Sequence, residues 1–220
     1  MTESFRAWKV GLPYYLPLLA AGAAMIGLGF AWGAIWVALG VVLLGAGVFT
    51  LNFFRDPHRA ISLDPAAVVS PADGLVVAIE NFDNHDHYEG PCVRISIFLN
   101  VFNVHVNRIP FDGEVTRVQY KPGQFKNAMK PETSQINESN AVHLQTSRGS
   151  MTVRQISGAV ARRIVCIVKP GDHLPKGARL GMIKFGSRTE LYLPAGADIH
   201  VTLREKVRGG SSIVAYLREQ

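Results

Sequence analysis

The feature that most constrains this chain is an apolar run over residues 10–54 that contains no Asp, Glu, Lys, Arg or His. As one helix the run would be about 68 Å long, more than twice the roughly 30 Å hydrocarbon core of a bilayer. Two spans of about 20 residues fit, with a turn near residues 30–33, where glycine and tryptophan suit a hairpin tip. The run therefore predicts a helical membrane hairpin; a hairpin that enters only one leaflet is the alternative.

The flanks of the run indicate a retained anchor whose two ends lie in the cytoplasm. The run is longer than a signal-peptide core, and residues 52–57 after it do not form a cleavage site. Basic residues, which are enriched on the cytoplasmic side of membrane spans, stand at both ends. They are Arg6, Lys9, Arg55 and Arg59. We expect residues 1–59 to form a hairpin and linker in the cell (inner) membrane, and residues 60–220 to form a β-rich catalytic domain on its cytoplasmic face.

The remaining composition favours a membrane surface over nucleic acid as the partner. The formal net charge is +6, but the basic residues are scattered and no nucleic-acid motif is present. Attraction to an anionic leaflet, about 1 kcal/mol for each nearby basic residue, accounts for such a charge. Cys92 and Cys166 lie in apolar runs and are expected to be free thiols in a reducing compartment.

After residue 66 the sequence consists of short β-like runs separated by turn signals, which is typical of an all-β sandwich or barrel. The runs cover residues 68–69, 75–79, 93–99, 104–106, 113–118, 141–144 and 151–156. One short helix is expected over residues 157–167, with Ser157 as its N-cap. The polar segment 126–140 is expected to be a loop that covers a pocket.

Residues 183–194, IKFGSRTELYLP, are expected to form one further strand with a Gly-Ser pair at its centre. Glycine weakens the interior of a strand and usually marks a bend or a close backbone approach. Ser187 has the same parity as Leu191 and Leu193, so its hydroxyl is expected to point into the core. Gly186 and Ser187 are therefore candidates for chemistry at their own peptide bond.

Two other residues complete a possible Asp-His-Ser relay, in which histidine takes the serine proton and aspartate orients the imidazole. His105 lies with Asn103 and Asn107 on one polar face, since the apolar parity changes near residues 100–103 and indicates a bend. Asp73 lies in a turn before a strand. A solvent-facing sheet edge and an ordinary turn are the alternatives for these two residues.

Five ordered motifs resemble the short, bacterial and archaeal type of phosphatidylserine decarboxylase proenzyme. They are NFFRDPHR (52–59), VSPADGLVV (69–77), FNVHVNRIP (102–110), QISGAVARRIV (155–165) and IKFGSRTELYLP (183–194). The resemblance implies a soluble domain similar to a lipoyl-like β sandwich. It also implies self-cleavage between Gly186 and Ser187, which leaves chains 1–186 and 187–220 and converts Ser187 into a pyruvoyl group.

The resemblance implies decarboxylation of phosphatidylserine to phosphatidylethanolamine through a Schiff base to that pyruvoyl group, with no metal. Asp73 and His105 match the family's activating aspartate and histidine, and His105 is the expected proton donor in turnover. Longer members carry a second histidine where this chain has Phe102, so the role of that histidine does not transfer. The expected partners are the phospholipid, the membrane and the two chains of one precursor; a homo-oligomer is compatible with this interpretation.

Further residues are assigned individually. Asn137 and Glu138 are expected to contact the serine headgroup. Arg162, beside Arg163, is a candidate for the lipid phosphate; a charged helix surface is the default interpretation of the two arginines. The stretch DNHDHYEG (83–90) has the composition of a metal site but the spacing of a solvated turn. Two other functions stay open: a pyruvoyl-dependent decarboxylase of another amino compound, such as a free amino acid, and a membrane-tethered lipoyl-like carrier or adaptor that uses Lys176.

Overall fold

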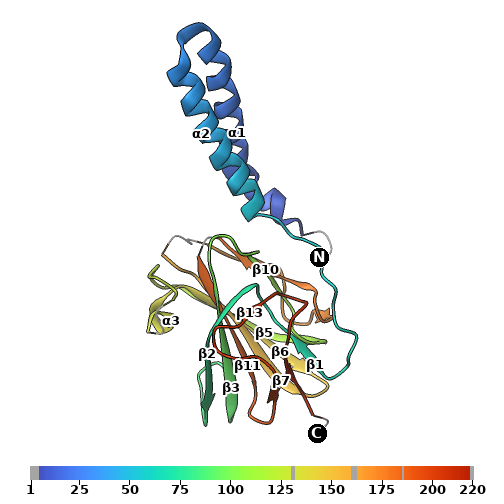
Figure 1. Ribbon diagram of the computed structural model, residues 1–220. Coiled ribbons are helices and arrows are strands. Elements are labelled where there is room, and N and C mark those ends of the chain that lie inside the picture. The colour runs from blue at the N-terminus through green and yellow to red at the C-terminus, as the bar shows by residue number, and fades with distance from the viewer. Residues whose placement is uncertain (1–4, 130–131, 160–162, 185, 219–220) are drawn as a thin grey trace. The chain divides into compact units, whose positions relative to one another are not determined.

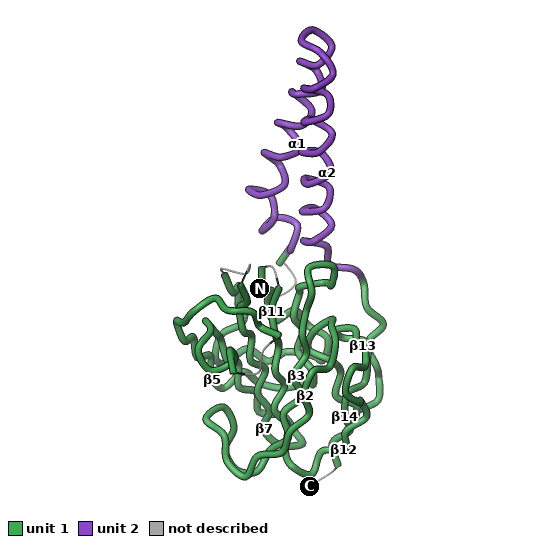
Figure 2. Tube along the Cα trace, turned by 60° about the vertical axis from the view of Figure 1, so that its left-hand side comes forward, with its two compact units in different colours: residues 1–5, 58–220 green, residues 6–57 purple. Residues whose placement is uncertain are grey.

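The computed structural model describes residues 5–129, 132–159, 163–184 and 186–218. The chain divides into a helical unit, residues 6–57, and a β-rich unit that contains residues 58–220 (Figure 2).

The helical unit is a hairpin of α1 (Ala7–Trp32) and α2 (Ala34–Phe53), which meet at Gly33. Both helices are long and apolar enough to cross a membrane. Their backbones approach closely where Gly22 faces Gly40, because a Cβ atom on either residue would lie within 3 Å of the other residue's carbonyl oxygen. Small residues at such crossings let membrane helices pack by van der Waals contact. The two predicted helices, and the turn between them near residues 30–33, are thus confirmed.

The β-rich unit is built from strands and one short helix in its described part. The elements are β1 (Ala67–Val69), β2 (Gly74–Phe82), β3 (Cys92–Leu99), β4 (Val106–Arg108), β5 (Gly113–Lys121), α3 (Thr133–Ile136), β6 (Ser139–Thr146), β7 (Gly149–Ile156), β8 (Ile164–Cys166), β9 (His173–Leu174), β10 (Arg179–Ile183), β11 (Ser187–Pro194), β12 (Asp198–Ile199), β13 (Lys206–Val207) and β14 (Ile213–Tyr216).

The main sheet has the strand order β13-β2-β3-β11-β7-β6-β5-β9 and curls into a half-barrel (Figure 1). Two smaller sheets, β1-β14-β12 and β4-β10-β8, accompany it. Strand β11 is central, with antiparallel neighbours β3 and β7 on its two sides. The mostly β fold that the sequence predicts is confirmed.

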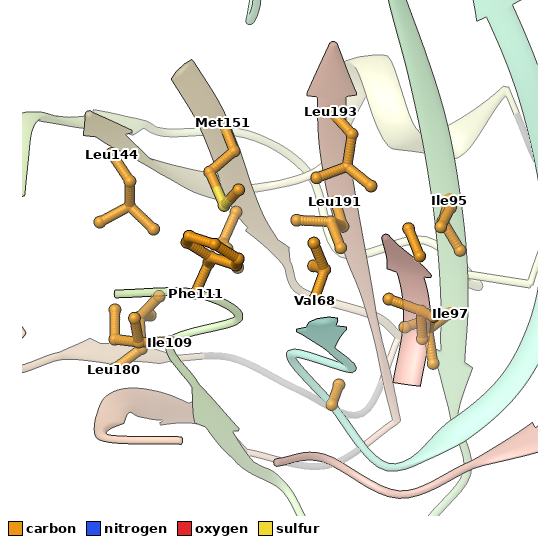
Figure 3. Packing of buried hydrophobic residues seen from close by; sticks show 14 of the residues in the cluster. Val68, Ile95, Ile97, Ile109, Phe111, Leu144, Met151, Leu180, Leu191 and Leu193 are labelled. Carbon is orange, nitrogen blue, oxygen red and sulfur yellow. The ribbon is translucent and has the colours of Figure 1, made fainter. Parts of the chain in front are cut away.

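The core lies on the concave face of the main sheet. Leu191 and Leu193 of β11 lie beside Ile95 and Ile97 of β3 (Figure 3), and all four side chains are fully buried. Phe111, which precedes β5, packs into the same cluster. Burial of each such side chain contributes roughly 1.5–3 kcal/mol, so this cluster stabilises the register of β11.

Two local predictions are wrong. Residues 157–159 and 163 are irregular and Ile164–Cys166 is strand β8, paired with β10, so the expected helix over residues 157–167 does not form in its described part. Residues 183–194 are likewise not one strand, because β10 ends at Ile183 and β11 begins at Ser187. The Gly-Ser pair therefore stands where a loop enters a central strand. The short helix that the described residues of this unit form is α3, within the long polar segment.

Candidate active site

The two faces of β11 have different chemistry because side chains alternate along a strand. Ser187 and Thr189 share the concave face with the apolar core, whereas Arg188 and Glu190 point to the opposite face. All four are at most 1% exposed. The site is therefore assembled at the end of the core where apolar side chains give way to polar ones.

Ser187 is the first residue of β11 and pairs with Leu99 of β3. Its side chain is completely buried, and its Oγ atom has no hydrogen-bond partner among the described residues. An unsatisfied buried hydroxyl costs stability, and such groups persist mainly where they have a chemical task. Gly186 precedes it with φ +46°, in the left-handed region that glycine adopts without strain.

The carbonyl group of Gly186 rests against Gly158, a contact that the sequence alone did not predict. A Cβ atom on Gly158 would lie 1.9 Å from the Gly186 oxygen, which is far inside contact distance. Gly158 follows Ser157, whose amide and hydroxyl groups donate to the Glu138 carbonyl oxygen at 2.9 and 3.2 Å. The carbonyl at the predicted cleavage point therefore has a position that only glycine at 158 permits.

His105 lies next to this peptide segment. Its carbonyl oxygen accepts a hydrogen bond from the amide of Ile183, the last residue before the loop that leads to Gly186. The imidazole is fully buried, and its Nδ1 atom is 3.0 Å from the Asn103 carbonyl oxygen. A carbonyl accepts only from a protonated nitrogen, so this contact favours the tautomer in which Nε2 carries the lone pair. That tautomer can accept a proton at Nε2.

Asp73 ends the turn before β2 and is 9% exposed. Its Oδ1 and Oδ2 atoms accept hydrogen bonds from Nη2 of Arg59 at 2.9 and 2.8 Å, and Oδ1 also accepts from the Gly209 amide at 2.8 Å. The turn is joined to β4 because the Arg108 amide donates to the Pro71 carbonyl oxygen. Asp73 is thus brought to the region of His105, with its carboxylate held by Arg59, a residue to which the sequence assigned no role here.

A chain of hydrogen-bonded, neutral amide side chains ends at the hydroxyl of Thr189 in β11. Asn140 donates to Gln155, Gln155 to Asn107, and Asn107 to the Thr189 hydroxyl, at 3.3, 2.9 and 3.1 Å. These side chains are all at least 97% buried. Asn107, expected on one polar face with His105, therefore lies inside the protein and positions the residue two places after Ser187.

The opposite face of β11 carries a buried charge network. Glu190 accepts hydrogen bonds from Ser134, Tyr192 and Arg154 at 2.6, 2.7 and 3.2 Å. Burial by itself raises the pKa of Glu190, but the positive charges of Arg154 and Arg94 and these hydrogen bonds hold it below its ordinary value. Burial acts to lower the pKa of Arg188, whose Nη2 donates to the Met129 carbonyl oxygen. The network joins α3 and the preceding loop to the strand that begins at Ser187.

The residues assigned to substrate binding have different surroundings. The Asn137 amide donates to the carbonyl oxygens of Lys126 and Ser157 and accepts from the Lys126 amide, so it joins two loops. Glu138 accepts from the Tyr120 hydroxyl at 2.8 Å through Oε1, whereas its buried Oε2 has no partner among the described residues. Arg162 lies outside the described residues. For Asn137 and Glu138 the headgroup contact stays a prediction.

Three further features of the sequence have surroundings of their own. The loop 83–90 lays His85 and His87 against the ring of Tyr192, with centroids 4.8 and 5.9 Å away. No group of three metal-ligating side chains occurs in the described part of the chain. Lys176 donates to the carbonyl oxygens of Asp64 and Ala67 at 2.6 and 3.1 Å, so it is not displayed as a carrier lysine would be. Cys92 and Cys166 are free thiols.

The arrangement supports acyl transfer within the chain. It offers a buried hydroxyl nucleophile on Ser187, the neighbouring Gly186 carbonyl in a fixed position, and His105 next to the loop that leads to Gly186.

Comparison with known proteins agrees with this chemistry. Residues 46–215 match the phosphatidylserine decarboxylase family. Proteins named phosphatidylserine decarboxylase proenzyme are similar over most of their length: one from Syntrophus aciditrophicus is 43% identical over 212 residues, which cover 96% of both chains. One from Burkholderia vietnamiensis is 46% identical over 198 residues, 89% of this chain and 87% of the relative. One from Desulfotalea psychrophila is 45% identical over 177 residues, 80% of this chain and 83% of the relative.

Proposed function

Because the chain belongs to the phosphatidylserine decarboxylase family, we propose that it converts phosphatidylserine into phosphatidylethanolamine and CO₂ at a pyruvoyl group made from its own Ser187. As a member of this family it is a self-processing carboxy-lyase. The observation that carries the proposal is the buried Ser187 hydroxyl, without a partner among the described residues, beside a glycine carbonyl seated on Gly158.

Self-processing begins when Ser187 Oγ bonds to the Gly186 carbonyl carbon and its proton passes to a base. The Gly186–Ser187 peptide bond then breaks, which leaves an ester and a free amine on residue 187. Removal of the Ser187 Cα proton expels the Gly186 carboxylate, and addition of water releases ammonia and leaves a ketone. His105 Nε2 is the proposed acceptor of the hydroxyl proton, since Nδ1 faces the Asn103 carbonyl oxygen.

For turnover, the pyruvoyl ketone supplies an electron sink for the bonding pair that remains when CO₂ departs. The chain's own residues bind the headgroup, exclude water and return a proton to the carbon that lost CO₂. His105 Nε2 is the proposed donor of that proton. Glu138 is the better placed of the two predicted headgroup contacts, because its Oε2 oxygen has no partner among the described residues whereas the Asn137 amide is used internally.

The proposed location is the cytoplasmic face of the cell membrane. Support comes from the two apolar helices and from the basic residues at both ends of the hairpin. A lipid with two acyl chains does not diffuse freely through water, so an anchored catalytic unit suits such a substrate.

A denaturing gel tests self-processing. The wild-type protein is expected to give fragments of residues 1–186 and 187–220, and Ser187→Ala to give one band and no CO₂ from phosphatidylserine. Ser150→Ala, at an exposed serine of β7, serves as the control and is expected to cleave normally.

His105→Ala and Asp73→Ala should slow cleavage by 10²-fold or more, the usual range for loss of an acid-base group. Folded wild-type protein that stays in one piece, with no carbonyl reactive toward hydrazine, would refute the proposal.

The two alternative functions predict different results. A decarboxylase of another amino compound also cleaves itself, but it releases CO₂ from a free amino acid rather than from phosphatidylserine. A lipoyl-like carrier stays as one band, and the hydrogen bonds of Lys176 disfavour it. The gel and the two substrates together therefore distinguish all three functions.

A further inference from the structure

A cavity of about 800 Å³ opens beside Asp73 at the end of the main sheet. Its wall includes the start of β2, Phe98 of β3 and the turn residue Asn103, whose carbonyl oxygen faces the His105 imidazole. Met129, whose carbonyl oxygen accepts a hydrogen bond from Arg188, is also in the lining. The lining therefore includes Asp73 itself and Phe98, which pairs with Arg188, the neighbour of Ser187. Neither Ser187 nor His105 is among its lining residues, and its own ligand is unassigned.

Two cationic side chains, Lys206 and Arg208, line this cavity. Both are exposed, and neither forms an ion pair with any described residue. Val207 between them is buried and pairs with Gly74, which holds the two cationic side chains on the face opposite the core. The Gly209 amide donates to Asp73, and the Arg208 amide donates to the Ser212 hydroxyl. The backbone that carries the two charges is thus held in place by contacts within the cavity wall.

The net charge of the cavity is positive. Its one acidic residue among the described lining, Asp73, is compensated by Arg59 at 2.8 Å. Lys206 and Arg208 then leave two uncompensated positive charges. Clefts lined by one sign of charge concentrate ligands of the opposite sign.

The rest of the lining is mixed: Asn100, Asn103, Ser211 and Ser212 are polar, and its apolar part suits a ligand that is part lipid. Leu75, Phe98, Val207 and Met129 contribute hydrocarbon surface, and Met129 is 53% exposed. Phe102, between the lining residues Asn100 and Asn103, is 69% exposed. An anionic group joined to a glycerol backbone meets both kinds of surface at once.

We propose that Lys206 and Arg208 bind the phosphodiester of the lipid substrate and so determine its position relative to residue 187. The inference rests on the proposed function. A phosphodiester carries one negative charge and two free oxygens, to which guanidinium and ammonium groups donate charge-assisted hydrogen bonds. Because these bonds are present before and after loss of CO₂, they contribute to binding more than to the chemical step.

The test uses the full-length mature enzyme and a short-chain phosphatidylserine below its micelle concentration, so that attraction to a charged bilayer does not contribute. The double variant Lys206→Gln with Arg208→Gln is expected to cleave normally, to raise KM about tenfold or more, and to keep kcat within about twofold. The control is Lys169→Gln with Arg117→Gln, which removes two exposed charges outside the cavity lining and is expected to leave KM unchanged. The charge-retaining variant Lys206→Arg with Arg208→Lys should recover most of the affinity.

Inorganic phosphate as a competitor gives a second measurement. It should inhibit the wild-type enzyme at lower concentration than the double glutamine variant, since it competes for the same two cations. An unchanged KM, an equal rise of KM in the control variant, or loss of cleavage in the double glutamine variant would each overturn the inference. Wild-type protein that cleaves itself but releases no CO₂ from phosphatidylserine would instead refute the proposed function.

Discussion

Gly158 is the residue that most directly constrains the peptide bond that we propose to react. The Gly186 carbonyl oxygen occupies the space that a side chain at 158 would fill. The restriction is steric, because an added Cβ would meet a backbone atom, which has little freedom to move. A methyl group at this position displaces the electrophilic carbon from the Ser187 hydroxyl.

Gly158→Ala is accordingly expected to slow self-cleavage by about 10²-fold, because misplacement of a reacting atom by about 1 Å costs that much in rate. The fraction of intact chain on a denaturing gel against time measures the effect. Gly196→Ala, where an added Cβ meets no atom within 4 Å, is the matched control and should cleave at the wild-type rate. Normal cleavage of Gly158→Ala would mean that the carbonyl does not depend on this contact.

At the scale of elements, β11 separates the apolar core and Ser187 on one face from a row of charged and polar side chains on the other. Cross-strand partners place Glu80, Arg94, Tyr192, Thr152 and His143 in one row across five strands. The loop 83–90 covers this row through His85 and His87. The loop between β2 and β3 is therefore coupled to the central strand by aromatic contacts.

The histidines make this coupling sensitive to pH. Burial, followed by the positive charges of Arg154 and His85, lowers the pKa of His87 from 6.5 to about 4. Between about pH 4 and pH 6.5, His87 binds a proton in the unfolded chain but not in the folded chain. The neutral His87 therefore makes its full contribution to the free energy of unfolding above about pH 6.5, and this contribution is lost as the pH falls toward 4.

Replacement of His87 by Asn, which does not titrate, should make the melting temperature less dependent on pH. Solvent screening of the half-buried ring reduces the effect to about 1 kcal/mol, or about 2–4 °C for a chain of this size. The difference in melting temperature between pH 7 and pH 4.5 measures it. His173→Asn, at a highly exposed histidine of β9, is the control. An equal pH dependence in wild type and His87→Asn would contradict this account.

At the scale of the whole molecule, self-cleavage is expected to leave one folded particle. The small chain begins with β11, which is hydrogen-bonded to β3 along its full length and to β7 over Arg188 to Tyr192. It also supplies β13, paired with β2, and β14, paired with β1. Its buried Leu191 and Leu193 each contribute roughly 1.5–3 kcal/mol to cohesion with the large chain.

Mature enzyme in mild detergent should therefore elute from a sizing column as one species that contains both chains. Its elution volume should equal that of uncleaved Ser187→Ala, and the chains should separate only in concentrated urea. Loss of the small chain under native conditions would show that β11 is not held as the register indicates.

The sequence by itself determined the helical hairpin, the mostly β class and the pair of residues that we propose to react. A run of residues 10–54 without a charged side chain is long enough for two apolar helices, strand periodicity is local, and the motif around Gly186 and Ser187 is contiguous. Only the tertiary structure decided where β10 ends and β11 begins, that Arg59 holds Asp73, and that Gly158 seats the Gly186 carbonyl. The physical reason is that each of these depends on contacts between residues at least 14 positions apart in the chain, and local periodicity does not specify such contacts.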